Sequence, residues 1–184
     1  IYTDGASKGN PGPGGYGVVM EMVGTPYKKE FFEGFRYTTN NRMELLAVIV
    51  GLEKLKAPKT SVLVVSDSKY VVDSVEKGWV FGWEKKNFKD KKNPDLWMRF
   101  LKIYRQHNVK FMWVKGHNSH PQNERCDELA VMASQQKNLN IDNKSFVKLE
   151  KSKHKGIQNN LNNIKVLFEK EFQISFSKRT NRLT

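Results

Sequence analysis

The order of strand-like and helix-like runs along residues 1–136 leaves few folds open to this chain. Strand-like runs come first, and helix-like and strand-like runs then alternate. The expected strands are 1–4, 16–22, 28–36, 62–65 and 111–114, and the expected helices are 42–55, 68–76, 79–84, 95–107 and 124–134. The short apolar run 62–65 is typical of a strand that is buried on both faces of a sheet. The sequence therefore predicts an α/β fold with a five-stranded mixed β-sheet flanked by helices.

A change in composition near Gln136 divides the chain. Residues 137–184 contain 11 Lys and Arg against 4 Asp and Glu, and they are rich in Asn. Such a shift is typical of a domain boundary. We therefore predict a folded domain over residues 1–136 and a basic, Lys/Asn-rich, partly helical C-terminal extension over residues 137–184. Residues 1–3 read as the end of a strand whose start is missing from the sequence.

Apolar side chains recur at helical spacing in the extension. They lie 4, 3, 4 and 4 residues apart, at Ile157, Leu161, Ile164, Phe168 and Phe172. This spacing predicts an apolar stripe along one face of a helix. Four interpretations stay open: a frayed appendage, a helix packed on the domain, an auxiliary nucleic-acid-binding arm, and a helix for self-association.

The net charge of +13 at pH 7 indicates a polyanionic partner, either nucleic acid or an anionic membrane surface. Cys126 is the single cysteine, which excludes a disulfide framework and a cysteine-rich zinc site and favours a reducing compartment. No apolar run approaches the roughly 18–20 residues that span a bilayer, and no signal peptide opens the chain. We therefore expect a cytoplasmic protein that has no membrane partner.

Four acidic residues stand out, although local structure alone can explain each of them. They are Asp4, Glu44, Asp67 and Asp127. Asp4 belongs to an Asp-Gly pair that is common in turns. Glu44 completes a capping-box pattern that begins at Asn41. Asp67 precedes an expected helix that it can cap, and Asp127 lies in the first turn of another, where the helix dipole favours a carboxylate.

Taken together, the four carboxylates indicate a metal site. If the strands 1–4 and 62–65 are parallel neighbours, Asp4 and Asp67 project from the same end of the sheet. The helices that carry Glu44 and Asp127 can then bring these side chains against them. Carboxylates this close repel one another and need a cation to stay ionised, and oxygen ligands without His or Cys favour Mg²⁺ or Mn²⁺. In a basic protein this predicts phosphodiester chemistry, in which two ions about 3.5–4 Å apart activate water and stabilise the leaving oxygen.

Five sequence motifs around these carboxylates resemble the ribonuclease H family, in its cellular type 1 branch with bacterial-style motifs. They are YTDGASKGNPGPGGYG (2–17), TTNNRMEL (38–45), SDSKYV (66–71), KNPDLW (92–97) and KGHNSHPQNERCDELA (115–130). They occur in the order found in the family and cover nearly all of residues 1–136. The resemblance implies a ribonuclease H-like fold for this domain.

The resemblance also implies a catalytic centre. Asp4, Glu44, Asp67 and Asp127 match the family's metal-binding carboxylates, which hold two Mg²⁺ ions per active site during catalysis, with Mn²⁺ as an alternative. His117 matches the family's mobile catalytic histidine. Its unperturbed pKa lies near neutrality, so it is suited to move a proton beside the metals. The alternative for His117 is a loop histidine that bonds to the backbone.

Contacts with a hybrid substrate are implied in the same way. Asn10, Asn40 and Asn41 match positions that contact the hybrid near the scissile strand. Amide side chains suit the 2′-hydroxyl group because both donate and accept hydrogen bonds. Thr39 and Asn93 match parts of a pocket for a DNA phosphate. Helix capping is the alternative role for Asn40 and Asn41.

A basic segment with interleaved aromatic residues spans residues 77–92 and holds six lysines against Glu84 and Asp90. By resemblance it is the family's basic protrusion, in which lysines meet phosphates and an aromatic ring lies against DNA sugars. The contacts expected there are Trp79, Trp83, Lys85 and Lys86. The alternative is an amphipathic helix whose aromatic side chains lie in the core.

The function implied by the resemblance is endonucleolytic hydrolysis of the RNA strand of RNA–DNA hybrids, which leaves 5′-phosphate and 3′-hydroxyl ends. Two other classes stay open: a hybrid-binding module without catalysis, and the nuclease domain of a reverse transcriptase. The complete set of four carboxylates argues against the first, and an extension unlike the continuation of a polymerase argues against the second. No obligatory protein partner is evident, so we expect a monomer.

Overall fold

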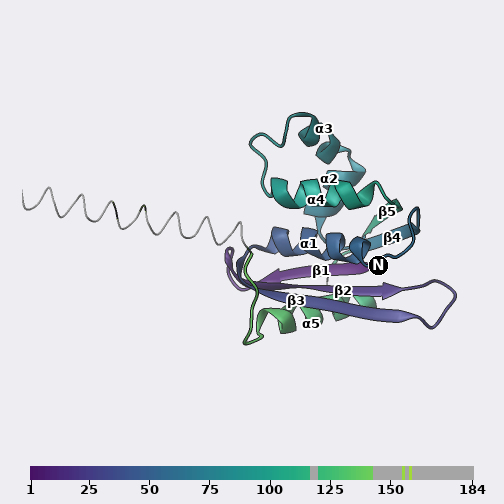
Figure 1. Ribbon diagram of the computed structural model, residues 1–184. Helices are drawn as coiled ribbons and strands as arrows, with labels where there is room; N and C mark the ends of the chain where they lie inside the picture. Colours follow the sequence, from purple (N-terminus) through teal and green to yellow (C-terminus); the bar gives the residue numbers. More distant parts are fainter. Residues whose placement is uncertain (117–119, 143–154, 156–157, 159–184) are drawn as a thin grey trace, which may run out of the picture. The chain divides into compact units, whose positions relative to one another are not determined.

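The computed structural model describes residues 1–116 and 120–142, together with Lys155 and Gln158. The chain divides into two units, Ile1–Asp142 and Asn143–Thr184 (Figure 1). Most of the predicted extension 137–184 lies outside the described residues, so its boundary and its apolar stripe stay predictions. Within the described ranges, no helix is both long and apolar enough to cross a membrane.

Strands and helices of the first unit follow the predicted order. The strands are β1 (Tyr2–Ser7), β2 (Gly12–Glu21), β3 (Lys28–Thr38), β4 (Ser61–Ser66) and β5 (Asn108–Trp113). The helices are α1 (Asn40–Glu53), α2 (Lys69–Glu76), α3 (Trp79–Lys85), α4 (Pro94–Tyr104) and α5 (Pro121–Ser134). The sheet order is β3-β2-β1-β4-β5, with β1, β4 and β5 parallel and β2 antiparallel to both of its neighbours. The predicted five-stranded mixed sheet is confirmed.

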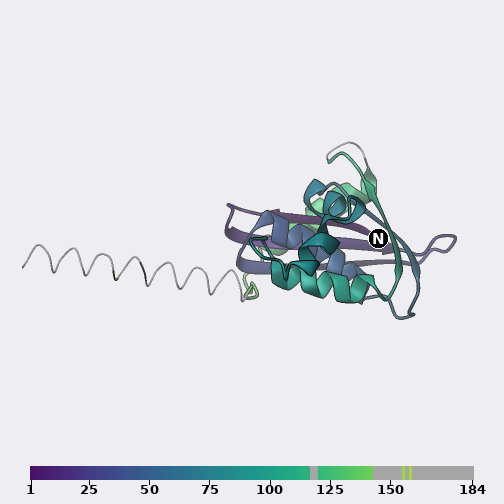
Figure 2. The ribbon, with the colours of Figure 1, turned by 90° about the horizontal axis from the view of Figure 1, so that it is seen from above.

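Helices cover both faces of this sheet. Figure 1 shows α5 on one face, against β1, β2 and β3, and α1 on the other face, between the sheet and α4. Figure 2 looks onto the layer of helices from above. Because α1 is enclosed by the sheet and α4, every side chain from Arg42 to Leu52 is buried. This helix is therefore a rigid support for functional residues.

A glycine lets α5 lie close to the sheet. A Cβ atom on Gly17 of β2 would overlap the carbonyl oxygen of Cys126 and lie 2.9 Å from the Cβ of Leu129. Since glycine has no Cβ, the helix can approach the strand directly. Cys126 and Leu129 are then buried with Val19, and α5 also lies against β1.

Several elements begin earlier than predicted, among them β5, which begins at Asn108 instead of residue 111. β2 begins at Gly12 instead of residue 16, because Gly14 and Gly15 pair with the end of β1. α1 begins at Asn40 instead of residue 42. α5 begins at Pro121 instead of residue 124, since proline at the first position of a helix needs no hydrogen-bond donor. The earlier helix starts place Glu44 and Asp127 further inside their helices than expected.

Candidate active site

The parallel pairing of β1 and β4 brings two carboxylates together. Tyr2 pairs with Val65, and Thr3 pairs with Ser66. The residue after Thr3 is Asp4, within β1, and the residue after Ser66 is Asp67, directly after β4. The predicted neighbourhood of these two strands is confirmed, and their aspartates lie at the same end of the sheet.

A backbone contact between β1 and α1 brings Glu44 to this point. A Cβ atom on Gly5 would overlap the backbone nitrogen of Glu44 and lie 2.8 Å from its Cα. Only glycine permits this approach, because any other side chain would push the helix away from the strand. The closeness of Asp4 and Glu44 therefore results from one contact between two rigid elements, β1 and α1.

Carboxylate oxygens of Asp4, Glu44 and Asp67 all lie within 4.8 Å of one another. Asp4 and Glu44 are each only 7% exposed, and Asp67 is half-buried. Two of the oxygens, Oε2 of Glu44 and Oδ1 of Asp67, are buried without a hydrogen-bond partner among the described residues. Buried acceptors normally have a partner, so these two atoms point to a ligand. Hard carboxylate oxygens are the donors that Mg²⁺ and Mn²⁺ prefer, so this set of residues fits such a cation.

The same crowding changes the protonation of the cluster. Burial, with the nearby charge of Asp67, raises the pKa of Asp4 to about 8. Burial and the charges of Asp4 and Asp67 hold the pKa of Glu44 well above its usual range. The metal-free cluster therefore retains protons near neutral pH, and a bound cation would take over their charge-compensating role.

Asp127 lies at the edge of the cluster. It is half-buried in the second turn of α5, and its charge contributes to the raised pKa of both Asp4 and Glu44. The expected place in a first helical turn is wrong, so the helix dipole does not explain a carboxylate here. All four predicted carboxylates are thus neighbours.

Local explanations fail for two of the other carboxylates as well. The cap residue of α1 is Thr39, one turn before Glu44, and its side chain makes no capping bond. The capping box predicted from Asn41 is therefore not formed. The cap of α2 is Ser68, whose side chain accepts a hydrogen bond from the backbone of Val71. Asp67 is thus not a cap, and its carboxylate is directed to the cluster instead.

Two residues that the sequence left unassigned hold Asp67. The indole Nε1 of Trp113 donates a hydrogen bond to the Asp67 carbonyl at 2.9 Å. The Nδ2 of Asn123, a buried residue of α5, lies 3.5 Å from Oδ2 of Asp67. Only the motif at 115–130 could have drawn attention to Asn123, because one asparagine in a helical turn carries no signal of its own.

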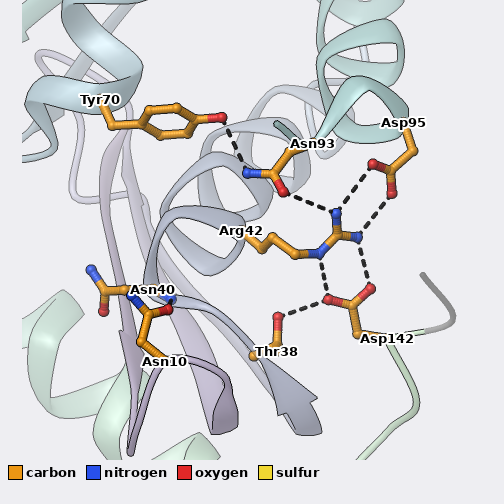
Figure 3. Close-up of polar contacts among 8 residues, drawn as sticks. All are labelled: Asn10, Thr38, Asn40, Arg42, Tyr70, Asn93, Asp95 and Asp142. Atoms are coloured by element: carbon orange, nitrogen blue, oxygen red, sulfur yellow. Dashed lines mark hydrogen bonds and ion pairs between the residues drawn. The ribbon is translucent and has the colours of Figure 1, made fainter. Parts of the chain in front are cut away.

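The predicted hybrid contacts gather at the start of α1, beside the carboxylates. Oδ1 of Asn10 accepts a hydrogen bond from the backbone of Asn40 at 3.2 Å, and Nδ2 of Asn40 donates to Oε1 of Glu44 at 3.3 Å. Figure 3 shows Asn10 and Asn40 side by side at this helix start. Thr39 is half-exposed and Asn41 is exposed. One continuous edge therefore carries both the carboxylates and the four residues 10, 39, 40 and 41.

Asn93 lies across α1 from this edge, directly before α4. Its backbone has a positive φ of 57°, which is uncommon for a residue other than glycine. Its Oδ1 accepts from Arg42 at 3.4 Å, and its Nδ2 donates to the hydroxyl of Tyr70 at 3.1 Å (Figure 3). The side chain is thus fixed in an internal network, and its predicted phosphate contact remains a prediction.

Aromatic residues of the basic segment 77–92 divide between core and surface. Trp79 is 47% exposed, with the Lys77 ammonium 4.9 Å from its ring centre. Trp83 packs edge-on against the buried Trp97 at 5.7 Å, and Phe88 is buried. Lys85 and Lys86 are exposed. Some of the aromatic side chains therefore lie in the core, as the alternative predicts, while Trp79 and the lysines lie on the outside, where their contacts with nucleic acid stay a prediction.

His117 lies outside the described residues, in the gap at 117–119. Its role in catalysis stays a prediction. His120, which follows the gap, precedes α5 and packs against the ring of Tyr2, with 5.3 Å between the ring centres.

Comparison with known proteins agrees with this architecture. The RNase H family model matches residues 1–135. A ribonuclease H from Desulforamulus reducens is 59% identical over 147 residues, which cover 77% of this chain and 91% of that protein. A ribonuclease H from Rippkaea orientalis is 54% identical over 147 residues, which cover 77% and 88%.

Solved structures share the fold. LC9-RNase H1, described as a type 1 RNase H with the type 2 active-site motif, is similar at a TM-score of 0.64 and 32% identity, over 72% of this chain and 70% of that one. LC11-RNase H1, solved in complex with an RNA/DNA hybrid, is similar at a TM-score of 0.50 and 29% identity, over 72% and 93%.

The structure combines a mixed sheet with a cluster of carboxylates beside β1 and β4, and the RNase H family model matches most of the chain. These findings together define a nuclease of the hydrolase class. The chain belongs to the ribonuclease H family, of the bacterial type, and is an enzyme of that family.

Proposed function

We propose that this enzyme cuts the RNA strand of RNA–DNA hybrids internally, by hydrolysis that leaves 5′-phosphate and 3′-hydroxyl ends. The observation that carries the proposal is the cluster of Asp4, Glu44 and Asp67, with two buried oxygens that have no hydrogen-bond partner among the described residues. It lies in a protein with a net charge of +13. The hybrid bound by the similar LC11-RNase H1 supports the choice of substrate.

Asp4, Glu44, Asp67 and Asp127 are the residues that would hold Mg²⁺, with Mn²⁺ as an alternative. Two such ions, when bound, supply an activated water and stabilise the developing charge on the leaving oxygen. The chain contributes rigidity, since α1 and β1 meet at Gly5 and Trp113 fixes the backbone of Asp67. Asn40 orients the Glu44 carboxylate through its Nδ2.

We further propose that His117 transfers a proton during product formation or release. A histidine changes its charge near neutral pH, so it can both accept and give up a proton under working conditions. This role rests on the match of His117 to the family motif at 115–130.

Selection of RNA falls to the amide groups at the start of α1. The contacts within the described chain use Oδ1 of Asn10 and Nδ2 of Asn40, and they leave Nδ2 of Asn10 and Oδ1 of Asn40 for the substrate. One donor and one acceptor match a 2′-hydroxyl group, which also donates and accepts. Asn41 is exposed and extends the same row.

The DNA strand would then lie across α1 and the basic segment. Thr39 and Asn93 are the residues that we propose for a phosphate, on their match to the family's motifs, and Lys85 and Lys86 would add charge attraction from the segment 77–92. Trp79 presents an exposed ring that can lie against a sugar. Trp83, which packs edge-on against Trp97, is the second aromatic side chain that we propose for the hybrid. We propose that the enzyme acts as a monomer in the cytoplasm, a compartment that suits its single free cysteine.

One assay tests the proposal. Matched RNA–DNA, RNA–RNA and DNA–DNA duplexes of one sequence are incubated with the full chain, with Mg²⁺ and with EDTA. Cleavage is expected only in the RNA strand of the hybrid and only with metal, and end-labelled products should carry 5′-phosphate groups. Cleavage of duplex DNA at a comparable rate would contradict the proposal.

A further inference from the structure

Arg42 is a buried cation whose hydrogen-bonding capacity is fully used inside the protein. It is 6% exposed and lies in α1, two residues before Glu44. Its Nε donates to Asp142 at 2.6 Å, and its Nη2 donates to Asp142 at 2.7 Å and to Asp95 at 2.9 Å. Its Nη1 donates to Asp95 at 3.1 Å and to Asn93 at 3.4 Å. A guanidinium has five N–H groups, so none is left for a phosphate, and Arg42 acts on other residues instead.

Asp142 holds this arginine from a segment beyond α5. It is 8% exposed, and its carboxylate also accepts a hydrogen bond from the hydroxyl of Thr38 at 2.7 Å. Figure 3 shows Asp142 between Thr38 and Arg42, with Asp95 on the far side of the guanidinium. The carboxylate therefore ties the last residue of β3 to the first turn of α1.

The segment that carries Asp142 is itself anchored along β3. The backbone of Asn140 donates to Gly34 at 2.8 Å and accepts from Arg36 at 2.9 Å. The Nε of Arg36 also donates to the carbonyl of Leu139 at 2.9 Å. These bonds hold Asp142 in place independently of Arg42.

Asp142 is linked to the proposed substrate contacts on two sides, through Thr38 on one side and through Arg42 on the other. Thr38 precedes Thr39, Asn40 and Asn41, which are the proposed contacts at the start of α1. On the other side, Arg42 bonds to Oδ1 of Asn93, whose Nδ2 donates to the hydroxyl of Tyr70, and that hydroxyl also accepts from Nε1 of Trp97 at 2.8 Å. Because a positive φ is unfavourable for a residue other than glycine, these side-chain bonds help to hold the backbone of Asn93 in its conformation.

We propose that Asp142 is a positioning residue for hybrid binding, which acts through Thr38 and Arg42 on the residues 39–41 and through Arg42 on Asn93. The proposal rests on the proposed function, because those residues are its substrate contacts. Asp142 touches no reacting atom, and the carboxylate cluster is held separately by the contact between α1 and β1 at Gly5. Loss of Asp142 should therefore weaken substrate binding far more than turnover.

Steady-state cleavage of a hybrid by the full chain tests this, at a temperature where each variant is folded by circular dichroism. Asp142→Ala should raise KM about tenfold and change kcat by less than about twofold. Asp142→Asn keeps one acceptor oxygen and should give a smaller rise in KM. Thr38→Val removes the hydroxyl that bonds Asp142 and should act in the same direction, so the test does not depend on whether Asp142→Ala folds.

A matched control separates positioning from general stability. Arg99 of α4 makes two hydrogen bonds to Glu53 of α1, at 2.8 and 2.6 Å, and so joins the same two helices as Arg42 and Asp95. Glu53→Gln should leave KM and kcat unchanged. An equal rise in KM from Glu53→Gln would overturn the proposal, because loosened packing of α1 on α4 would then explain both effects.

A binding measurement in an inactive variant distinguishes the role of Asp142 from the proposed function. The Kd for a fluorescent hybrid is measured in the Asp67→Asn background, with and without Asp142→Asn, and the second change is expected to raise Kd severalfold. If the unmodified chain cleaves hybrid and the Asp142 and Thr38 variants keep its KM and Kd, the role of Asp142 is refuted while the proposed function stands. If the unmodified chain binds hybrid but does not cleave it, the proposed function fails, and the Kd values still decide the role of Asp142.

Discussion

Gly5 of β1 and Glu44 of α1 touch backbone to backbone, so closely that a Cβ on Gly5 would overlap the Glu44 nitrogen. This contact sets the distance between the strand that carries Asp4 and the helix that carries Glu44. It places the two carboxylates in one cluster with Asp67.

Replacing Gly5 with alanine should therefore separate α1 from β1. We expect Gly5→Ala to lower the free energy of unfolding by about 1–3 kcal/mol or more, as for overpacked cores, and to reduce cleavage at least about a hundredfold, because the cluster would open. Urea unfolding and single-turnover cleavage measure the two effects. Gly82→Ala is the control, since a Cβ there meets no atom within 4 Å, and it should leave both quantities nearly unchanged.

The metal-free enzyme should lose stability as the pH rises from about 4 to about 8. The pKa of Asp4 is about 8 in the folded protein against an ordinary 3.8, so between these values the folded state binds a proton that the unfolded state does not. The stabilising contribution is complete below pH 3.8 and disappears as the pH rises through 8, and the raised pKa of Glu44 acts with the same sign. Urea unfolding in EDTA at pH 5 and pH 8 measures the change.

Two additions identify the cause of that pH dependence. Asp4→Asn should make stability in EDTA less dependent on pH and raise it at pH 8. Mg²⁺ should stabilise the unmodified protein at pH 8, because a ligand that binds only the folded state shifts unfolding. A pH dependence of the same size in Asp4→Asn would show that other groups cause it.

The two neighbouring histidines should behave differently. His117→Ala is expected to slow turnover substantially and to change its pH dependence through the neutral range, while leaving measurable activity. His120→Ala should mainly affect stability, because the ring of His120 packs against Tyr2. Rates between pH 6 and pH 9 for both variants measure this, and an equal effect of the two changes would mean that the assignment to His117 is wrong.

Charges on the basic segment should govern the salt dependence of binding. Lys85→Gln with Lys86→Gln should weaken hybrid binding and flatten the plot of log Kd against log salt, by up to about one unit of slope for each lost phosphate contact. Lys56 and Lys102 serve as controls, because both are exposed and lie outside the segment 77–92, Lys56 between α1 and β4 and Lys102 in α4. Replacing Lys56 and Lys102 with Gln should leave the slope of log Kd against log salt unchanged within error. If the slope falls as much as it does for the Lys85 and Lys86 variant, net charge alone explains the effect.

Much of the site could be predicted from the sequence, because two neighbouring parallel strands bring Asp4, within β1, and Asp67, directly after β4, together whatever the details of the loops. The pairing of β1 with β4 and the cluster of carboxylates follow from that geometry. The starts of helices were harder to predict, because the start of α1 depends on how the chain leaves β3. The pattern from Asn41 to Glu44 predicted Asn41 as the cap residue, whereas the cap residue is Thr39. Local sequence fixes a cap only to within a residue or two.

The partnership of Arg42 with Asp142 could not be predicted. The two residues lie 100 positions apart, and the segment around Asn140 is anchored largely through backbone hydrogen bonds that leave no pattern in the side chains. From the sequence alone, Arg42 could not be assigned a role. Only the positions of its five donors show that it is occupied internally.

Whether the carboxylate cluster holds the metals that cut RNA is tested most directly by Asp67→Asn. The change keeps the size of the side chain and removes one charged oxygen from the cluster. Single-turnover cleavage of a hybrid at saturating Mg²⁺, measured beside the Kd of the same hybrid, should show a loss of rate of at least about a thousandfold with Kd nearly unchanged. A loss of less than about tenfold, roughly 1.4 kcal/mol of barrier, would contradict the account.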